Sequence, residues 1–160
     1  GEAEDHDDFP SMIDVNDSRF FAPESMVEAI KDYCRQTDQK VPEKIGEISA
    51  VVYKSLAECY ARTVTEIERN TGKQFEDIRI VGGGSNADYL NRLTACYSGR
   101  KVYAGPGEAT AIGNGLAQMI RTGEFADLKE ARESVFGSFD IKEYLPRQIG
   151  GRKDDNQRKI

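Results

Sequence analysis

The spacing of apolar residues predicts two helices in the first half of the chain. In residues 24–35 the apolar positions recur at i, i+3, i+4, i+7 and i+8, which is typical of an amphipathic helix, and Pro23 suits its first turn. Residues 44–70 continue this spacing on one stripe, and Gly72 follows as a C-terminal cap. The arm before them, residues 9–21, is apolar without periodicity. We expect it to pack on an apolar surface, which need not belong to this chain.

The second half alternates short strands with helices. A β-branched run at residues 77–81 predicts a strand, and three glycines follow it. A helix is expected over residues 86–97, with Ser85 and Asp88 as its capping box. A second strand is predicted at residues 102–104.

Two further helices complete the pattern. After a glycine-proline-glycine turn, residues 108–122 predict a helix that Gly123 closes. Residues 128–136 predict the last helix, with Asp127 and Glu130 as its capping box. Strand–helix–strand units of this length favour parallel pairing. The sequence therefore predicts an α/β fold in which short parallel strands, flanked by helices, form part of a larger sheet.

Composition narrows the function classes. The 160 residues carry 28 acidic and 22 basic side chains, a formal net charge of −6, whereas a nucleic-acid-binding domain concentrates lysine and arginine on one face. No apolar run approaches the roughly 20 residues that span a bilayer. Three widely spaced cysteines predict neither a disulfide framework nor a zinc site, so no metal ligand is assigned. We expect a soluble, cytoplasmic protein with neither a nucleic-acid partner nor a membrane partner.

The two ends of the chain differ in composition from its middle. Residues 1–8 hold five carboxylates and are expected to be a disordered acidic end, in which His6 is solvated. Residues 147–160 are mostly basic and polar and are expected to be a mobile tail. The folded portion is therefore predicted over residues 9–146.

The most informative stretch is the glycine turn, Val-Gly-Gly-Gly-Ser-Asn at residues 81–86. Glycine permits positive φ and lets a ligand approach the main chain, and the helix that follows offers N–H groups with a partial positive charge. Such a turn suits a phosphate or the edge of a nucleotide. A tight strand-to-helix turn that binds nothing explains the same residues, and local chemistry leaves both interpretations open.

Two common nucleotide motifs can be compared with this turn. The P-loop requires a lysine after the glycines, and none is present. The dinucleotide fingerprint G-x-G-x-x-G/A matches formally at Gly82, Gly84 and Ala87, which would make the chain part of an NAD-binding oxidoreductase. The following strand ends in Ala104, where that fingerprint places an acidic residue for the ribose, so the match is weak.

A longer comparison is more specific. The run IRIVGGGSNADYLNRLTACYSGRKVYAGPGEATAIGNGLAQMI, residues 78–120, resembles the C-terminal nucleotide-binding lobe of FGGY-family sugar kinases, and within them most of all the rhamnulokinase branch. Three earlier segments, at residues 12–37, 41–48 and 54–60, support the resemblance in the order expected along the chain. The resemblance therefore covers about residues 9–146. It implies the actin-like, hexokinase-type (ribonuclease H-like) ATPase fold, with ATP and Mg²⁺ as cofactors.

In that family the glycine turn is the adenosine motif. The resemblance implies that Gly83 and Gly84 contact an adenine nucleotide through their main chain, with Gly82, Ser85 and Asn86 beside them. The Asn86 side chain is expected either to hydrogen-bond the nucleotide or to face solvent.

A second family segment is expected close to the glycine turn. Glu108, Ala109, Thr110 and Gly113 match the helix that packs near the nucleotide, and small residues there are expected to allow close helix-to-sheet packing. Gly107 departs from the bulkier apolar residue of that pattern.

The resemblance implies a C-terminal fragment of an ATP-dependent kinase that phosphorylates L-rhamnulose to L-rhamnulose 1-phosphate in L-rhamnose catabolism. Phosphoryl transfer needs a general base, Mg²⁺ and phosphate-holding loops, which are expected in a missing N-terminal lobe together with the sugar site, so no catalytic residue is assigned here. The isolated chain is expected to be inactive, to bind nucleotide weakly and to self-associate through exposed apolar surface. A fuculose or xylulose kinase, an NAD-binding oxidoreductase fragment and a non-catalytic nucleotide-binding module are the alternatives.

Overall fold

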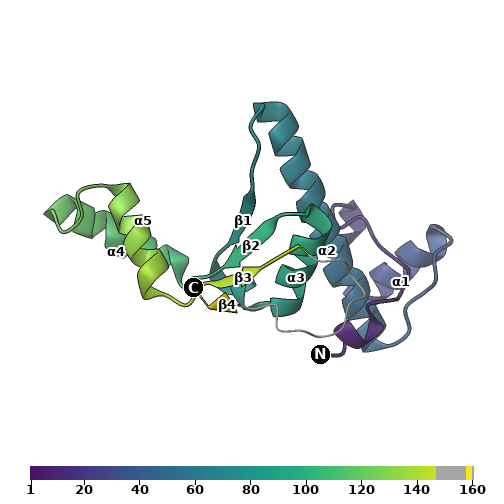
Figure 1. Cartoon of the computed structure of the whole chain (residues 1–160). Coiled ribbons are helices and arrows are strands. Elements are labelled where there is room, and N and C mark those ends of the chain that lie inside the picture. The colour runs from purple at the N-terminus through teal and green to yellow at the C-terminus, as the bar shows by residue number, and fades with distance from the viewer. Residues whose placement is uncertain (147–157, 160) are drawn as a thin grey trace. The chain divides into compact units, whose positions relative to one another are not determined.

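The computed structural model describes residues 1–146 and 158–159, and its contacts divide the chain into two compact units (Figure 1). Unit 1, residues 1–73, is helical. Unit 2, residues 74–160, combines a small sheet with three α-helices among its described residues. The mixed α/β class predicted from the sequence is confirmed, with the strands confined to unit 2.

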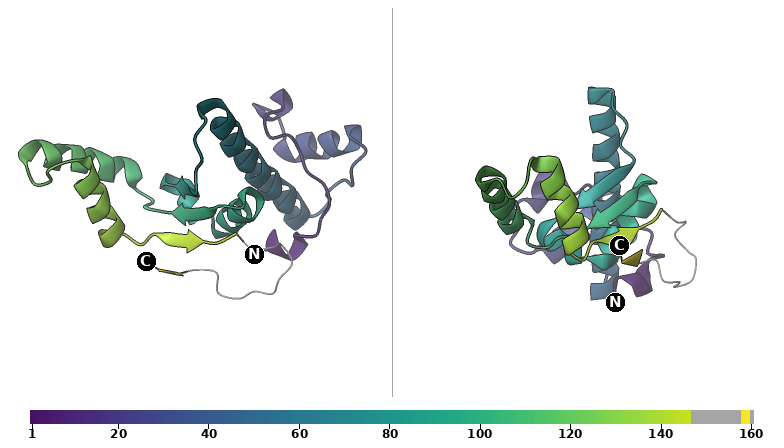
Figure 2. Two further views of the ribbon diagram at one scale, coloured as in Figure 1. Left: turned by 45° about the horizontal axis from the view of Figure 1, so that its top comes forward. Right: turned by 60° about the vertical axis from the view of Figure 1, so that its left-hand side comes forward.

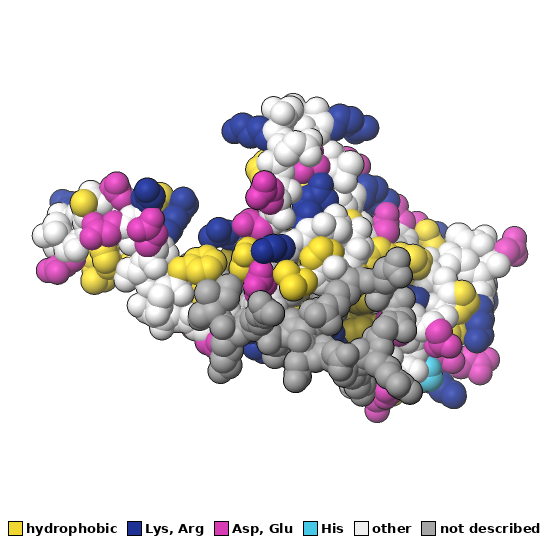
Figure 3. All heavy atoms as spheres, in the orientation of Figure 1, with side chains coloured by type: hydrophobic (Ala, Val, Ile, Leu, Met, Phe, Trp, Pro, Cys, Tyr) yellow, Lys and Arg dark blue, Asp and Glu magenta, His cyan; other side chains and the backbone are white. Residues whose placement is uncertain are grey.

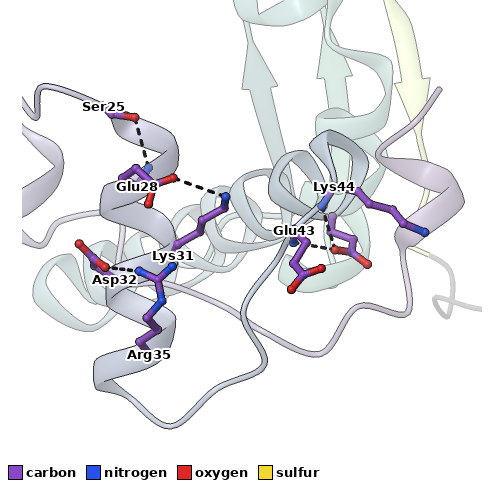
Figure 4. A network of polar contacts seen from close by, with 8 residues as sticks. Ser25, Glu28, Lys31, Asp32, Arg35, Glu43 and Lys44 are labelled. Carbon is purple, nitrogen blue, oxygen red and sulfur yellow. Dashed lines mark hydrogen bonds and ion pairs between the residues drawn. The ribbon is translucent and has the colours of Figure 1, made fainter.

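The first predicted helix is α1 (Met26–Gln36). It begins after Ser25, whose Oγ accepts a hydrogen bond from the Glu28 N–H at 3.3 Å (Figure 4). The expectation that Pro23 occupies the first turn is wrong, because Pro23 lies two residues before the cap. On the solvent side, Lys31 Nζ pairs with the Glu28 carboxylate at 3.4 Å, an i, i+3 contact typical of an exposed helix face.

The long predicted helix is α2 (Ile45–Thr71). Its first turn is fixed by the Glu47 carboxylate, which accepts the N–H groups of Glu43 at 2.8 Å and Lys44 at 3.1 Å (Figure 4). These two hydrogen bonds hold the pKa of the Glu47 carboxyl below its usual value. Gly72 ends the helix with φ +67°, which confirms the predicted cap.

The non-periodic arm at residues 9–21 packs on unit 1 itself. The Ile13 N–H donates to Ser55 Oγ on α2 at 2.9 Å, and the Met12 N–H donates to the Gln39 side chain at 2.8 Å. The arm contributes apolar side chains to one buried cluster with α1 and α2, made up of Phe9, Ile13, Ile30, Cys34 and Val51. The arm is thus part of the core of unit 1, and burial raises the pKa of the Cys34 thiol there.

The acidic end, residues 1–8, has local structure where the sequence predicts disorder. It contains a 3-10 helix, η1 (Glu4–His6), and Ala3 is buried. His6 is half-buried rather than solvated, because it lies over Gly46 in the first turn of α2. Lys54 Nζ on α2 donates to the carbonyl oxygens of residues 7 and 9, and burial lowers the pKa of this ammonium group. Together these contacts attach the charged end to α2.

Unit 2 is built on a sheet with strand order β1-β2-β3-β4. The predicted strands β1 and β2 are parallel, with Ile78 opposite Val102, as expected. The third strand was not predicted from the sequence; β3 pairs antiparallel with β2, and β4 antiparallel with β3. The strands are β1 (Asp77–Ile80), β2 (Lys101–Ala104), β3 (Lys142–Tyr144) and β4 (Arg158–Lys159). Apart from β4, the tail predicted to be mobile at residues 147–160 lies outside the described residues.

The two faces of this sheet differ. One face carries the buried side chains of Val102 and Tyr144 and packs against helix α3 (Asp88–Ser98). The other face carries the cross-strand row Arg79, Tyr103 and Glu143, in which the Tyr103 hydroxyl donates to the Glu143 carboxylate at 3.4 Å. The hydrophobic core of unit 2 therefore lies between the sheet and α3.

Helices α4 (Ala109–Thr122) and α5 (Leu128–Ser138) pack against each other (Figure 2). Gly123 ends α4 with φ +86°, as predicted. Asp127 caps α5 by accepting the N–H of Glu130 at 2.9 Å. The Glu130 carboxylate reaches back to the Ala126 N–H rather than to that of Asp127, so the predicted capping box is shifted by one residue on that side.

Charged side chains of both signs are interspersed over the face shown in Figure 3. Among the described residues, no helix combines the length and the apolar character needed to cross a membrane.

We predict that Gly46→Ala weakens the attachment of residues 1–8. A Cβ at Gly46 would lie 2.4 Å from His6 Cδ2 and 2.7 Å from the Glu2 carbonyl oxygen. Such overpacking should lower the free energy of unfolding by about 1–2 kcal/mol, measured by urea denaturation.

Gly115→Ala in α4 is the matched control, because a Cβ there meets nothing within 4 Å. It should raise the free energy of unfolding by about 0.5–1 kcal/mol, the usual gain for Gly→Ala inside a helix. Equal stabilisation by both substitutions would show that residues 1–8 do not rest on α2.

Candidate functional site

The glycine turn connects β1 to α3 through a 3-10 helix, η3 (Gly82–Asn86). Two backbone hydrogen bonds extend the pairing of β1 and β2 beyond the ends of the strands. The Gly105 N–H donates to the Ile80 carbonyl at 2.9 Å, and the Gly82 N–H donates to the Pro106 carbonyl at 3.1 Å. The loop after β2 thereby holds the first residue of the glycine turn.

Two glycines at this junction are needed for backbone conformation. Gly82 has φ +72°, a value that L side chains rarely adopt. Gly105 has φ +125°, and a Cβ there would lie 2.8 Å from the Asp140 carbonyl oxygen in the segment that leads to β3. Main chain from three parts of unit 2 thus meets at Gly105, beside the base of the glycine turn.

The predicted capping box of Ser85 and Asp88 is wrong. Ser85 is buried inside η3, and its Oγ donates to the Gly82 carbonyl at 2.7 Å instead of capping a helix. The helix α3 begins only at Asp88, after Ala87, and not at residue 86. Asn91, one turn into α3, is fully buried, and its Nδ2 donates to the Ser85 carbonyl at 3.0 Å. The buried side chains of Ser85 and Asn91 therefore hydrogen-bond the main chain of the glycine turn from the protein interior.

Asp88 joins the start of α3 to β3. Its Oδ1 accepts hydrogen bonds from Lys142 Nζ at 2.9 Å and from the Tyr144 hydroxyl at 2.5 Å. Burial, and then the hydrogen bond to Asp88, raise the pKa of Tyr144 above its usual value. Tyr144 therefore stays protonated near neutral pH and donates to Asp88. Sequence patterns missed Asn91, Lys142 and Tyr144, since β3 is too short to show any periodicity.

Gly83 and Gly84 differ from Gly82. Both are exposed and neither has positive φ. A Cβ would meet nothing within 4 Å at Gly83, and at Gly84 only Ile80 Cγ2 at 3.5 Å, an ordinary contact. Neither backbone conformation nor packing against the described residues requires glycine at these two positions.

The predicted site residues therefore separate into two layers. Gly83, Gly84 and Asn86 are exposed, whereas Ser85 is buried beneath them and Gly82 is half-buried. The exposed Asn86 belongs to η3, so it does not lie in the first turn of α3.

The segment at residues 107–113 was expected to lie near the glycine turn and to pack closely on the sheet. A Cβ at Gly107 would lie 3.9 Å from Asn86 Nδ2 and 4.0 Å from Ser85 Oγ, so this loop lies beside the glycine turn and has room for a side chain. Glu108 and Thr110 are exposed, Ala109 is half-buried, and a Cβ at Gly113 would meet nothing within 4 Å. The expected close packing of this helix on the sheet is wrong for Gly113, because α4 has no buried residue and packs on α5.

In the part of the chain that the structure describes, no group of three or more His, Cys, Asp or Glu side chains is placed to hold a metal ion. The groups that the glycine turn exposes are main-chain groups and the Asn86 amide, which can donate and accept hydrogen bonds.

Residues 2–122 match the family described as the FGGY family of carbohydrate kinases, C-terminal domain. The chain belongs to this family. The match includes the glycine turn and α4, whereas β3 lies outside it. The NAD-binding alternative is not favoured, and the three glycines lie within the 3-10 helix η3, ahead of α3, unlike the direct strand-to-helix turn of the dinucleotide fingerprint.

Several curated relatives of this FGGY chain are named rhamnulokinase. It is 49% identical over 148 residues to a rhamnulokinase of Bacillus subtilis, covering 92% of this chain and 30% of the relative. It is 46% identical over 140 residues to a rhamnulokinase of Ligilactobacillus salivarius, covering 88% and 29%. A rhamnulokinase of Bacteroides thetaiotaomicron is 38% identical over 148 residues, with coverage of 92% and 30%. The chain thus spans about 30% of the length of these relatives.

We predict that Gly105→Ala destabilises unit 2 strongly. The substitution combines φ +125° with a Cβ placed 2.8 Å from a backbone carbonyl oxygen. The free energy of unfolding should fall by about 2–4 kcal/mol, measured by urea denaturation.

Gly107→Ala, two residues further on, is the control, since its Cβ has ordinary contacts and its φ is not positive. Its effect should stay within about 1 kcal/mol. Similar losses in both variants would contradict the role assigned to Gly105 in joining the three segments.

Proposed function

We propose that this chain is the C-terminal, nucleotide-side portion of an ATP-dependent sugar kinase that phosphorylates L-rhamnulose to L-rhamnulose 1-phosphate. The proposed fold is the actin-like, hexokinase-type (ribonuclease H-like) ATPase lobe, and the proposed role of the glycine turn is to hold the adenosine part of ATP. Membership of the FGGY family supports the reaction class, and the names of the relatives support the sugar.

One observation supports the nucleotide role most strongly. Gly83 and Gly84 are exposed glycines that the fold does not require, because neither has positive φ and neither Cβ would clash. In a 3-10 helix that begins at Gly82, the Gly83 N–H has no acceptor within the helix. Absent side chains on a fixed turn leave the main chain accessible, which is what close approach of a flat base or a ribose requires.

Catalysis is proposed to need residues beyond this chain. ATP supplies the γ-phosphoryl group when bound, and Mg²⁺ neutralises charge on the phosphates. The chain spans about 30% of the length of its relatives. We propose that the Mg²⁺ ligands, the general base and the sugar site come from the remaining part of a protein of that length, and that the reaction takes place in the cytoplasm. The isolated chain is proposed to be inactive, to bind nucleotide weakly and to self-associate.

A chimeric kinase tests the proposed function. The matched segment of the Bacillus subtilis rhamnulokinase would be replaced by this chain, which covers 148 aligned residues at 49% identity. We expect ATP-dependent phosphorylation of L-rhamnulose with kcat/KM within about tenfold of the parent enzyme, measured by coupled ADP release. A chimera that unfolds cooperatively but shows no turnover would contradict the proposed function.

Gly83→Val in this chimera tests the adenosine site. A Cβ at Gly83 would meet none of the described residues within 4 Å, so we expect little change in stability, while the valine side chain occupies the space proposed for the nucleotide. We expect the KM for ATP to rise about tenfold or more, equivalent to about 1.4 kcal/mol, with the KM for L-rhamnulose unchanged.

The matched control is Gly137→Val in α5, another exposed helical glycine whose Cβ would meet nothing within 4 Å. It should leave both KM values unchanged. An unchanged KM for ATP in the Gly83 variant would place the nucleotide elsewhere.

A further inference from the structure

The contacts beneath the glycine turn come from a segment far away in the sequence. Lys142 and Tyr144 of β3 both donate to Asp88 Oδ1, across 54 and 56 residues of chain. Asp88 lies in the first turn of α3, where a negative charge is favourable to the helix, so pairing it here also fixes the start of α3. These two hydrogen bonds thus add a polar link between α3 and β3 to the apolar packing between them.

Asn91 carries this constraint to the glycine turn. Its side chain is fully buried, and its Nδ2 donates a hydrogen bond to the Ser85 carbonyl at 3.0 Å. Its Oδ1 is buried without a hydrogen-bond partner among the described residues. A buried polar atom without a partner destabilises the folded state by about 1–3 kcal/mol. Packing alone therefore does not explain an asparagine at residue 91.

The connection continues from Ser85 to the exposed glycines. The Ser85 carbonyl is held by Asn91, and the Ser85 hydroxyl holds the Gly82 carbonyl at 2.7 Å. Gly82 and Ser85 are the neighbours of Gly83 and Gly84 in the sequence. The main chain of these two glycines is therefore hydrogen-bonded on both sides. Hydrogen bonds thus join β3 to Asp88 at the start of α3, and Asn91, three residues further along the same helix, joins α3 to the glycine turn.

We propose that Lys142 and Tyr144 are positioning residues for the nucleotide: by fixing Asp88 at the start of α3, the helix that also carries Asn91, they hold the main chain of Gly83 and Gly84 in the geometry that binds adenosine. This inference rests on the proposed function of the glycine turn. It assigns to β3, which lies outside the matched family region, a part in ATP binding.

The opposite face of the sheet offers matched controls. Tyr103 of β2 donates its hydroxyl to Glu143, and Lys101 Nζ pairs with the same carboxylate at 3.2 Å. These two residues repeat the tyrosine–lysine–carboxylate arrangement on the face turned away from α3. Any general effect of losing a tyrosine hydroxyl or a lysine charge from this sheet should therefore appear in both pairs.

The test compares Tyr144→Phe and Lys142→Met with Tyr103→Phe and Lys101→Met in the active chimera. We expect the first two substitutions to raise the KM for ATP about three- to tenfold, since each removes a hydrogen bond to a charged group, with the KM for L-rhamnulose and kcat unchanged. The two controls should change the KM for ATP by less than about twofold. Lys142→Met keeps the test valid if Tyr144→Phe does not fold.

The possible outcomes separate this inference from the function on which it rests. If the unsubstituted chimera folds but is inactive, the proposed function is wrong and the inference falls with it. If the chimera is active and the β3 variants lose only thermal stability, with the KM for ATP unchanged, β3 is purely structural and the inference alone is overturned.

Discussion

The pairing of main chain between the ends of β1 and β2 is the constraint on which the rest of unit 2 depends. Beyond the strands themselves, the Gly105 N–H still bonds to Ile80 and the Gly82 N–H to Pro106. These bonds require glycine at residues 82 and 105, where φ is positive. They keep the two loops that leave the sheet side by side, so the glycine turn has a fixed base.

Glycines in this turn serve two different physical purposes. Gly82 and Gly105 satisfy a backbone conformation, whereas Gly83 and Gly84 satisfy neither a conformation nor a packing constraint. The sequence alone does not distinguish the three adjacent glycines. The φ values and the contacts that an added Cβ would make do distinguish them. The consequence for function is that an accessible main chain is presented on a rigid support, which lowers the entropic cost of ordering the turn when a ligand binds.

The support comes from polar groups rather than from apolar packing alone. Ser85 and Asn91 are buried polar residues whose hydrogen bonds converge on the turn, and Tyr144 joins them to the apolar core between the sheet and α3. Polar networks in a low-dielectric interior define one geometry more sharply than apolar contacts do, at the cost of desolvation. Asn91 Oδ1 is buried and has no hydrogen-bond partner among the residues that the structure describes, so part of this cost is not offset there.

How much the sequence predicts depends on the range of the interactions that decide each element. The helices α1 and α2 were predicted to within two residues at each end, because their amphipathic spacing is local and long. The start of α3 was misplaced: Ser85-x-x-Asp88 resembles a local cap, but contacts from Asn91 and from β3 decide the role of both residues. β3 itself was missed because three residues carry no periodicity, and its position depends on pairing with β2. For the site, the resemblance indicated the glycine turn, while the residues beneath it required the structure.

The central claim is that the adenosine part of ATP lies on the main chain of Gly83 and Gly84. A crystal structure of the chimeric kinase with Mg²⁺ and a non-hydrolysable ATP analogue tests it most directly. The account predicts the adenosine in van der Waals or hydrogen-bond contact with the main chain of these two glycines, with Ser85 and Asn91 still hydrogen-bonded beneath. An analogue bound with its adenosine away from both glycines would contradict the account.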